Sequence, residues 1–212
     1  MNHPMQPPAR VASRRQRAPA IRHVMLALLA VAAVACLLDA CRIHAKAALA
    51  QFLLQRAWQP AEAGGAAARP WPGADTRPVG RLRVARLHVD QIVLAGDSGR
   101  TLAFGPGWAE ASAAPASGRG GAIVISGHRD THFAWLAGLV PGDEITLGSG
   151  GGVRRYRVAA SHVADARHER LVPEAVEGLV LVTCWPFDAV RSGGPMRYVV
   201  HALPVGAAPD AS

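Results

Sequence analysis

The segment from Gly80 to Leu203 consists of short apolar runs, and this pattern constrains the fold more than any other feature of the chain. Each run ends at Gly, Pro or Asp, as strands do. The candidate strands are Leu82–Leu87, Gln91–Leu94, Ala122–Ser126, Glu144–Leu147, Val153–Val163, Leu179–Thr183 and Arg197–Leu203. Seven or eight short strands favour an all-β fold, a closed or nearly closed β-barrel, because closure removes exposed sheet edges. Short helical turns are expected near Phe133–Leu139 and Pro173–Val176.

The first part of the chain carries a basic stretch followed by an apolar run. Five arginines and no acidic residue precede fifteen uncharged residues, Val24–Leu38. The run is short for a span of about 20 residues, but its apolar character continues to Cys41, past Asp39. We expect a basic cytoplasmic segment over residues 1–23 and a single-pass signal-anchor, a transmembrane helix, over residues 24–41. The basic flank predicts that the N-terminus lies inside the cell and that the rest of the chain is exported.

Two processing routes are alternatives to this anchor. A cleaved signal peptide has the same basic flank and apolar run. The tetrapeptides that end at Cys36 and Cys41 loosely resemble lipoprotein signals, although neither has the usual consensus form. A mature N-terminus near either cysteine would distinguish these routes from an uncleaved anchor.

The sequence changes twice between the apolar run and the strands. Residues 42–58 place apolar side chains three to four positions apart, as in an amphipathic helix. Residues 59–79 are rich in Ala, Gly and Pro and lack apolar periodicity, which is typical of a linker. We therefore expect a domain boundary near Pro78, a globular domain over residues 80–205 and a flexible tail over residues 206–212.

The positive charge is concentrated near the N-terminus. The chain of 212 residues has a formal net charge of +8, and residues 1–46 account for +6 of it. The remainder is nearly neutral and has no basic stripe with interleaved aromatic residues. A nucleic-acid partner is therefore not expected.

Cys184 is the only cysteine beyond the expected transmembrane segment, residues 24–41, so it cannot form a disulfide within the exported domain. It ends an apolar strand and precedes the loop-forming pair Trp185-Pro186. One interpretation is a small buried side chain. The other is a nucleophile, because strand ends place reactive side chains beside a cleft. A thiol with a pKa of about 8.5 then needs a base or a cation beside it.

Two residues are candidates for those roles. His128 follows a buried strand and Gly127, which suits a base at the strand exit or a histidine hydrogen-bonded at the sheet rim. Arg197 begins the last strand, and if that strand pairs with the cysteine strand, its guanidinium would lie near the thiol. There it would stabilise a thiolate and a developing oxyanion. Arg191 in the preceding loop is its rival, and a solvated strand-edge arginine is the structural alternative.

These residues resemble the motifs of sortases, the membrane-anchored cysteine transpeptidases. Val180–Cys184, with Arg197 at the start of the last strand, is similar to the TLxTC signature, although Val180 stands where many members have Thr. The sequence SGHRDTHF, Ser126–Phe133, resembles the histidine motif, and Gly142–Ile145 resembles the start of the strand that follows it.

The resemblance covers about Gly80–Leu203. The N-terminal helix sequence and Cys184–Asp188 are most similar to the sortases of Gram-negative bacteria.

The resemblance implies transpeptidation on a sortase-like barrel, without a metal or organic cofactor. Cys184 would be the nucleophile, His128 the acid/base partner and Arg197 the group that binds the oxyanion and orients the substrate. Thr183 would hydrogen-bond the sorting peptide. The implied partners are a protein with a C-terminal LPxTG-like sorting signal and an amine acceptor. The connection over residues 165–178 would line the peptide groove, although its composition also suits a solvated turn.

Two functions from other classes compete with this one. A metal-binding module would use His128 and His132, four residues apart with Asp130 between them, and the further potential ligands are His162, His168 and Cys184. A structural periplasmic β-domain with an inert cysteine is the other. Metal content and thiol labelling would distinguish the three.

Overall fold

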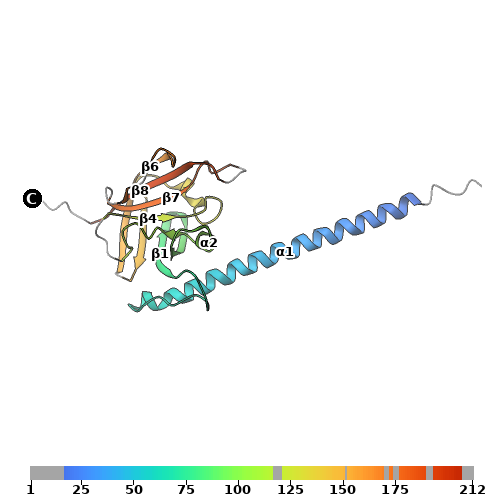
Figure 1. Ribbon diagram of the computed structural model, residues 1–212, viewed down its shortest axis with the longest axis horizontal. Helices are drawn as coiled ribbons and strands as arrows, with labels where there is room; N and C mark the ends of the chain where they lie inside the picture. The colour runs from blue at the N-terminus through green and yellow to red at the C-terminus, as the bar shows by residue number, and fades with distance from the viewer. Residues whose placement is uncertain are drawn as a thin grey trace, which may run out of the picture. The chain divides into compact units, whose positions relative to one another are not determined.

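The computed structural model describes residues 17–116, 121–150, 152–169, 172–173, 177–189 and 193–206 (Figure 1). The chain divides into two compact units, Met1–Lys46 and Ala47–Ser212. One long helix, α1 (Arg17–Glu62), contributes residues to both units.

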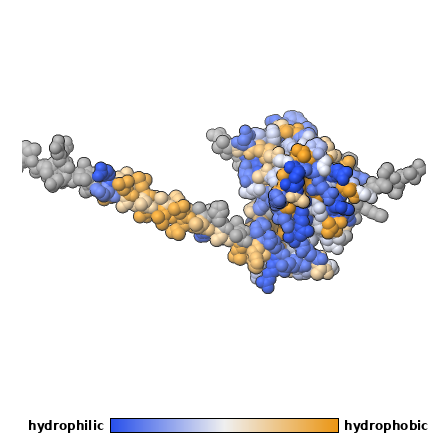
Figure 2. All heavy atoms as spheres, turned by 180° about the vertical axis from the view of Figure 1, so that it is seen from behind, coloured by the Kyte–Doolittle hydropathy of each residue, from blue (hydrophilic) through white to orange (hydrophobic). Residues whose placement is uncertain are grey.

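The part of α1 in the first unit carries the apolar run. Its window Arg22–Asp39 is long and apolar enough to cross a membrane, and none of it is buried. Figure 2 shows the hydrophobic surface along this part of the helix. The helix is consistent with the membrane anchor or signal segment expected over residues 24–41.

The second unit is a closed barrel, with eight strands in the part of the chain that the structure describes. They are β1 (Pro78–Val84), β2 (Val89–Ala95), β3 (Gly107–Trp108), β4 (Ala122–Ser126), β5 (Glu144–Ser149), β6 (Gly152–Asp165), β7 (Gly178–Cys184) and β8 (Met196–Pro204). Their order around the barrel is β1-β2-β3-β4-β7-β8-β6-β5, and β5 also pairs with β1. The predicted closed barrel is confirmed.

Alternation along the strands separates the barrel core from an outer apolar patch. Leu179 and Leu181 of β7 are fully buried in the main core. Val180 belongs to a separate cluster with Val124 of β4 and Val199 of β8. Because successive side chains of a strand point to opposite faces, this second cluster lies on the other face of β4, β7 and β8, which are neighbouring strands in Figure 1.

Several strand boundaries differ from the sequence prediction. The strand expected over Leu82–Leu87 ends at Val84, and a 3₁₀ turn, η1 (Ala85–Leu87), follows it. The chain then turns through His88, whose φ of 53° is left-handed. β3 was not predicted, because a strand of two residues is too short to show a period of two.

The short helices agree only in part with the expected turns. The 3₁₀ helix η2 (Ala134–Gly138) falls inside the range Phe133–Leu139. The helix α2 (Gly99–Leu102) was not predicted. Of the turn expected near Pro173–Val176, all but Pro173 lies outside the described residues.

The segment expected to be a linker, residues 59–79, packs against the barrel. α1 continues to Glu62 and includes Pro60. Beyond the helix, Trp71 contacts the ring of Phe104 at 5.2 Å between centroids, and the hydroxyl of buried Thr76 donates to the carbonyl of Ala95 (2.8 Å). Tertiary contacts therefore order a segment whose composition lacks the periodicity of regular structure.

Candidate active site

Strand pairing brings Cys184 and Arg197 together, and it places the end of β4, which leads to His128, beside β7. In the parallel pair β4–β7, Ser126 lies opposite Val182, and the amide of Gly127 donates to the Val182 carbonyl (3.1 Å). His128 lies two residues after Ser126, and Cys184 lies two residues after Val182. In the antiparallel pair β7–β8, Cys184 lies opposite Arg197. Neighbouring strands are about 4.8 Å apart, so the pairing places Cys184 and Arg197 side by side, and His128 follows two residues after the end of β4.

The same register places the side chains of Cys184 and Arg197 on the outer face. Cys184 has the parity of Val180, a member of the outer patch, and Arg197 has the parity of Val199. A cleft of about 190 Å³ lies on this face. Its lining residues are His162, Ala164, Ala166, Glu169, Val182, Arg197 and Val199. Two of them, Ala166 and Glu169, belong to the connection 165–178 that was expected to line a peptide groove.

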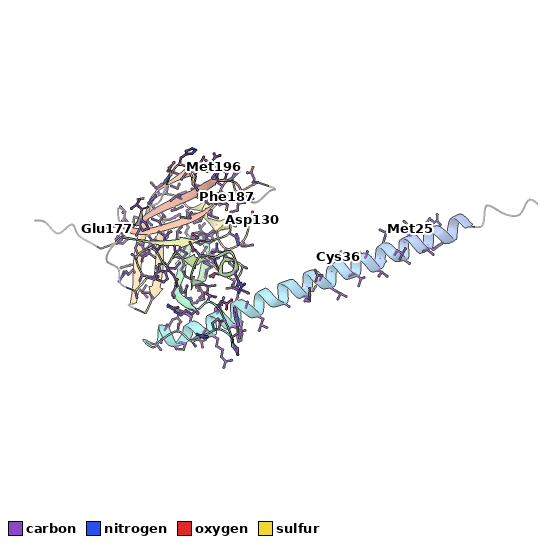
Figure 3. The ribbon with its side chains drawn as sticks, viewed as in Figure 1. Met25, Cys36, Asp130, Glu177, Phe187 and Met196 are labelled. Atoms are coloured by element: carbon purple, nitrogen blue, oxygen red, sulfur yellow. The ribbon has the colours of Figure 1, made fainter. Side chains whose placement is uncertain are left out.

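Cys184 is half-buried and is a free cysteine. Backbone pairing continues past it, because the amide of Trp185 donates to the carbonyl of Met196 (3.1 Å). Glu177, just before β7, and Phe187, just after it, lie at opposite ends of the barrel (Figure 3). The thiol therefore sits at the strand exit, as its sequence position predicted.

His128 is exposed and begins a tight turn, His128–Phe133, which we call the histidine turn. Its carbonyl accepts hydrogen bonds from the amides of Thr131 (3.3 Å) and Phe133 (2.9 Å). The preceding Gly127 admits no side chain, since a Cβ there would lie 2.6 Å from the ring of Phe133. The Gly-His pair of the motif thus lets the fully buried Phe133 pack under the turn that carries the imidazole.

Arg197 is half-buried, and its guanidinium folds back onto the chain just before it. Nη1 donates to the carbonyls of Gly194 (2.7 Å) and Met196 (2.9 Å). Its rival Arg191 lies outside the described residues.

Thr183 occupies a different position from the one expected. Its side chain is 2% exposed, and its Oγ1 donates to the carbonyl of Gly127 (2.7 Å). The alternation that directs Cys184 outward directs Thr183 into the barrel. This placement does not suit the expected contact with a sorting peptide, and it ties the cysteine strand to the histidine turn.

His132 is half-buried within the histidine turn. Burial lowers its pKa, a hydrogen bond with the backbone of Ala103 opposes this change, and the nearby His128 lowers it further. In the described ranges, His, Cys, Asp and Glu side chains form no group of three or more that could hold a metal ion.

Arg129, next to His128, was missed as a functional candidate. It is a buried arginine whose guanidinium contacts the loop that follows Cys184. Its place in the SGHRDTHF motif was visible in the sequence, but its burial was not.

The sequence model of one protein family, the sortase domain, matches residues 82–205, more than half of the chain. The chain belongs to the sortase family. Sortases are cysteine transpeptidases, so the matched domain, residues 82–205, is of that class.

The sortase domain is similar in sequence to a known sortase. It is 29% identical over 124 residues to Sortase D of Bacillus subtilis (strain 168), and this match covers 58% of the chain and 61% of that protein. The match thus spans less than two thirds of the curated relative.

Solved structures share the fold. Sortase A from Corynebacterium diphtheriae superposes with a TM-score of 0.56 at 26% identity, covering 66% of each chain. The Clostridium perfringens Sortase D5 transpeptidase has a TM-score of 0.53 at 22% identity, covering 61% of this chain and 80% of that one.

Proposed function

We propose that this protein is a membrane-anchored sortase that cleaves a C-terminal LPxTG-like sorting signal and transfers the acyl group to an amine. The observation that supports the proposal is the pairing of Cys184 with Arg197, beside the end of β4 from which His128 follows. A nucleophile, an acid/base group and a fixed cation are the groups that acyl transfer through a thioester requires.

The first half of the reaction forms the thioester. The Cys184 thiolate attacks the carbonyl carbon of the scissile peptide bond and produces a tetrahedral oxyanion. The Arg197 guanidinium donates hydrogen bonds to this oxygen, where charge develops. As the intermediate collapses, the C–N bond breaks, the His128 imidazolium protonates the departing amine, and the acyl group stays on Sγ.

The second half transfers the acyl group. The amine acceptor attacks the thioester carbonyl while neutral His128 takes up a proton from it. Collapse of this second tetrahedral intermediate breaks the C–S bond, forms a new amide and returns the Cys184 thiolate. Every proton moves through His128, so no metal or organic cofactor is needed.

The cleft beside Arg197 suits the sorting peptide. Its floor is formed by the small apolar residues Ala164, Val182 and Val199, so that an aliphatic peptide side chain would bury its surface there. Arg197 lies at this cleft and opposite Cys184, which brings the peptide carbonyl to the thiol.

The location and the subfamily are part of the proposal. We infer that the apolar window Arg22–Asp39 anchors the protein in the inner membrane with the barrel on the periplasmic side. Membership of the Gram-negative sortases rests on residues 43–58 and Cys184–Asp188 and stays a prediction.

Mass spectrometry of the full chain with a library of LPxTG-like peptides tests this function. Cys36 and Cys41 are changed to Ser, so that Cys184 is the only thiol. We expect an acyl adduct on the peptide that contains Cys184, and its loss when an amine acceptor is added.

Cys184→Ala in the same background is the control. It removes one sulfur atom at a strand end, so its melting temperature should stay close to that of the parent, with a loss of about 1 kcal/mol. Peptide cleavage by this folded variant, or an inert thiol in the parent, would favour the structural or metal-binding alternatives.

A further inference from the structure

Arg129 is a buried arginine between two exposed residues of the histidine turn. Its side chain is 5% exposed, whereas His128 and Asp130 are exposed. Nη1 donates to the carbonyl of Pro186 (2.8 Å) and Nη2 to the carbonyl of Ala189 (2.7 Å). Both carbonyls belong to the loop that leaves β7 directly after Cys184. Burial of a guanidinium costs free energy unless its donors are satisfied. Moving this loop away would break the two hydrogen bonds of Arg129, so they hold the loop in place.

The ion pair with Asp130 balances the charge of this guanidinium. Nε donates to Oδ1 of Asp130 at 3.1 Å. The carboxylate is itself largely exposed. The distinctive property of Arg129 is therefore its planar fork, which reaches two carbonyls of one loop at once.

The contacts of Arg129 and Thr183 flank both catalytic residues. Thr183, just before Cys184, donates to Gly127, just before His128. Pro186, two residues after Cys184, accepts from Arg129, just after His128. One of these hydrogen bonds precedes His128 and Cys184 in the sequence, and the other follows them. Each catalytic residue thus lies between two contacts that join its own segment to that of the other. The last backbone hydrogen bond between the β4 and β7 segments runs from Gly127 to Val182. The side-chain contacts of Thr183 and Arg129 connect the same two segments beyond that point.

We propose that Arg129 is a positioning residue of the sortase reaction, which holds the loop after Cys184 against the histidine turn and thereby sets the placement of the thiol relative to the imidazole. The inference rests on the proposed function, because it assigns His128 and Cys184 their catalytic roles. Arg129 acts through these two residues and has no contact with the peptide in this role.

The test compares Arg129→Lys and Arg129→Gln with the parent in the full chain carrying Ser at positions 36 and 41. Lysine keeps the charge but has one nitrogen and cannot form the fork, and glutamine keeps a donor without the charge. We expect kcat for peptide cleavage to fall about 10- to 100-fold in both, with KM within about threefold, since small displacements of reacting groups act on the chemical step. The pH midpoint of Cys184 alkylation by iodoacetamide should also move.

Arg86→Lys is the matched control for a merely structural role. Arg86 likewise donates to a backbone carbonyl, that of Gly138 (2.6 Å), and to a carboxylate, that of Asp143. The Arg86→Lys variant should have a lower melting temperature than the parent, with an unchanged kcat and an unchanged pH midpoint of Cys184 alkylation. Asp130→Asn, which removes the ion pair and leaves the carbonyl contacts, should also leave both quantities unchanged.

Each outcome decides the inference. A kcat within twofold of the parent in either folded Arg129 variant would overturn the inference. A loss of kcat in Asp130→Asn equal to that in Arg129→Lys would also overturn it, because it would indicate an electrostatic role. If neither Arg129 variant folds, Arg129 belongs to the fold and the positioning role is overturned. If the parent itself forms no thioester, the proposed function fails first, and this result is distinct from a working parent with unaffected variants.

Discussion

The guanidinium of Arg197 is held by the chain just before it. Its Nη1 is bound by the carbonyls of Gly194 and Met196, and its backbone is paired opposite Cys184. The charge is therefore fixed in direction as well as in place. A side chain with the same charge but without the planar guanidinium would lose this orientation.

Arg197→Lys should therefore be severely impaired although it keeps its charge. We expect kcat/KM for peptide cleavage to fall by at least about 100-fold, because a developing oxyanion loses an oriented donor. Steady-state kinetics and thermal unfolding, measured together, check this. Arg191→Ala should be mild by comparison, and the reverse ranking would transfer the role to Arg191.

Among the elements, the turn into β5 depends on a buried carboxylate. Asp143 is 8% exposed and accepts hydrogen bonds from Nε and Nη2 of Arg86 (2.5 and 2.6 Å) and from the amide of Val140 (2.9 Å). The hydrogen bond with Arg86 is the main reason why the pKa of Asp143 lies below its usual value. The ionised carboxylate thus fixes the chain between η2 and β5.

The lowered pKa of Asp143 predicts a pH-dependent contribution to stability. Because the folded pKa is below the unfolded value of about 3.9, this contribution is present above about pH 4 and is lost as the pH falls toward the folded pKa. Asp143→Asn should lower the melting temperature by on the order of 5 °C at pH 7. The difference from the parent should shrink below pH 4, as a series of thermal unfolding curves would show. An equal difference at pH 7 and pH 3 would contradict the ionic contribution.

The last turns of α1 form part of the barrel unit. Leu54 is 0% exposed and packs with Trp58 of the helix and with Ile92 and Leu94 of β2. The spacing of the apolar residues from 43 to 58 predicted a helix, but the surface that it covers follows only from the tertiary fold.

Leu54→Ala should lower the free energy of unfolding of the unit that begins at Ala47 by about 2–5 kcal/mol, because it removes a fully buried side chain. Leu49→Ala is the matched control, since Leu49 is 57% exposed on the same helix, and it should change the stability little. Urea unfolding measures both. Equal losses would mean that the helix does not pack on β2 through Leu54.

At the scale of the whole molecule, the charge and the apolar helix predict a single-pass topology. The full-length chain should fractionate with the inner membrane and resist carbonate extraction, and the barrel should be accessible to protease added from the periplasmic side. A chain without residues 1–46 should be released into the soluble fraction. A mature N-terminus near Cys36 or Cys41 would contradict the anchor but not the catalytic assignment, because the site lies wholly beyond Gly80.

The sequence by itself determined the β class, the apolar segment and the residues proposed for the site. Short runs bounded by Gly, Pro and Asp indicate strands locally, and a lone cysteine at a strand end is visible without a structure. The motif around His128 and the arginine before the last strand could likewise be recognised, because their residue types and order survive in the linear sequence.

Only the tertiary structure decided which residues meet and which are buried. Thr183 and Cys184 are neighbours in sequence, yet the pleat of β7 sends one into the barrel and the other to the site. Arg129 looks like a solvated charge in the sequence, but carbonyls 57 and 60 residues away satisfy it in the interior. The linker composition of residues 59–79 gave no sign that Trp71 packs on Phe104. These outcomes depend on contacts between distant segments, and local propensity and periodicity carry no information about them.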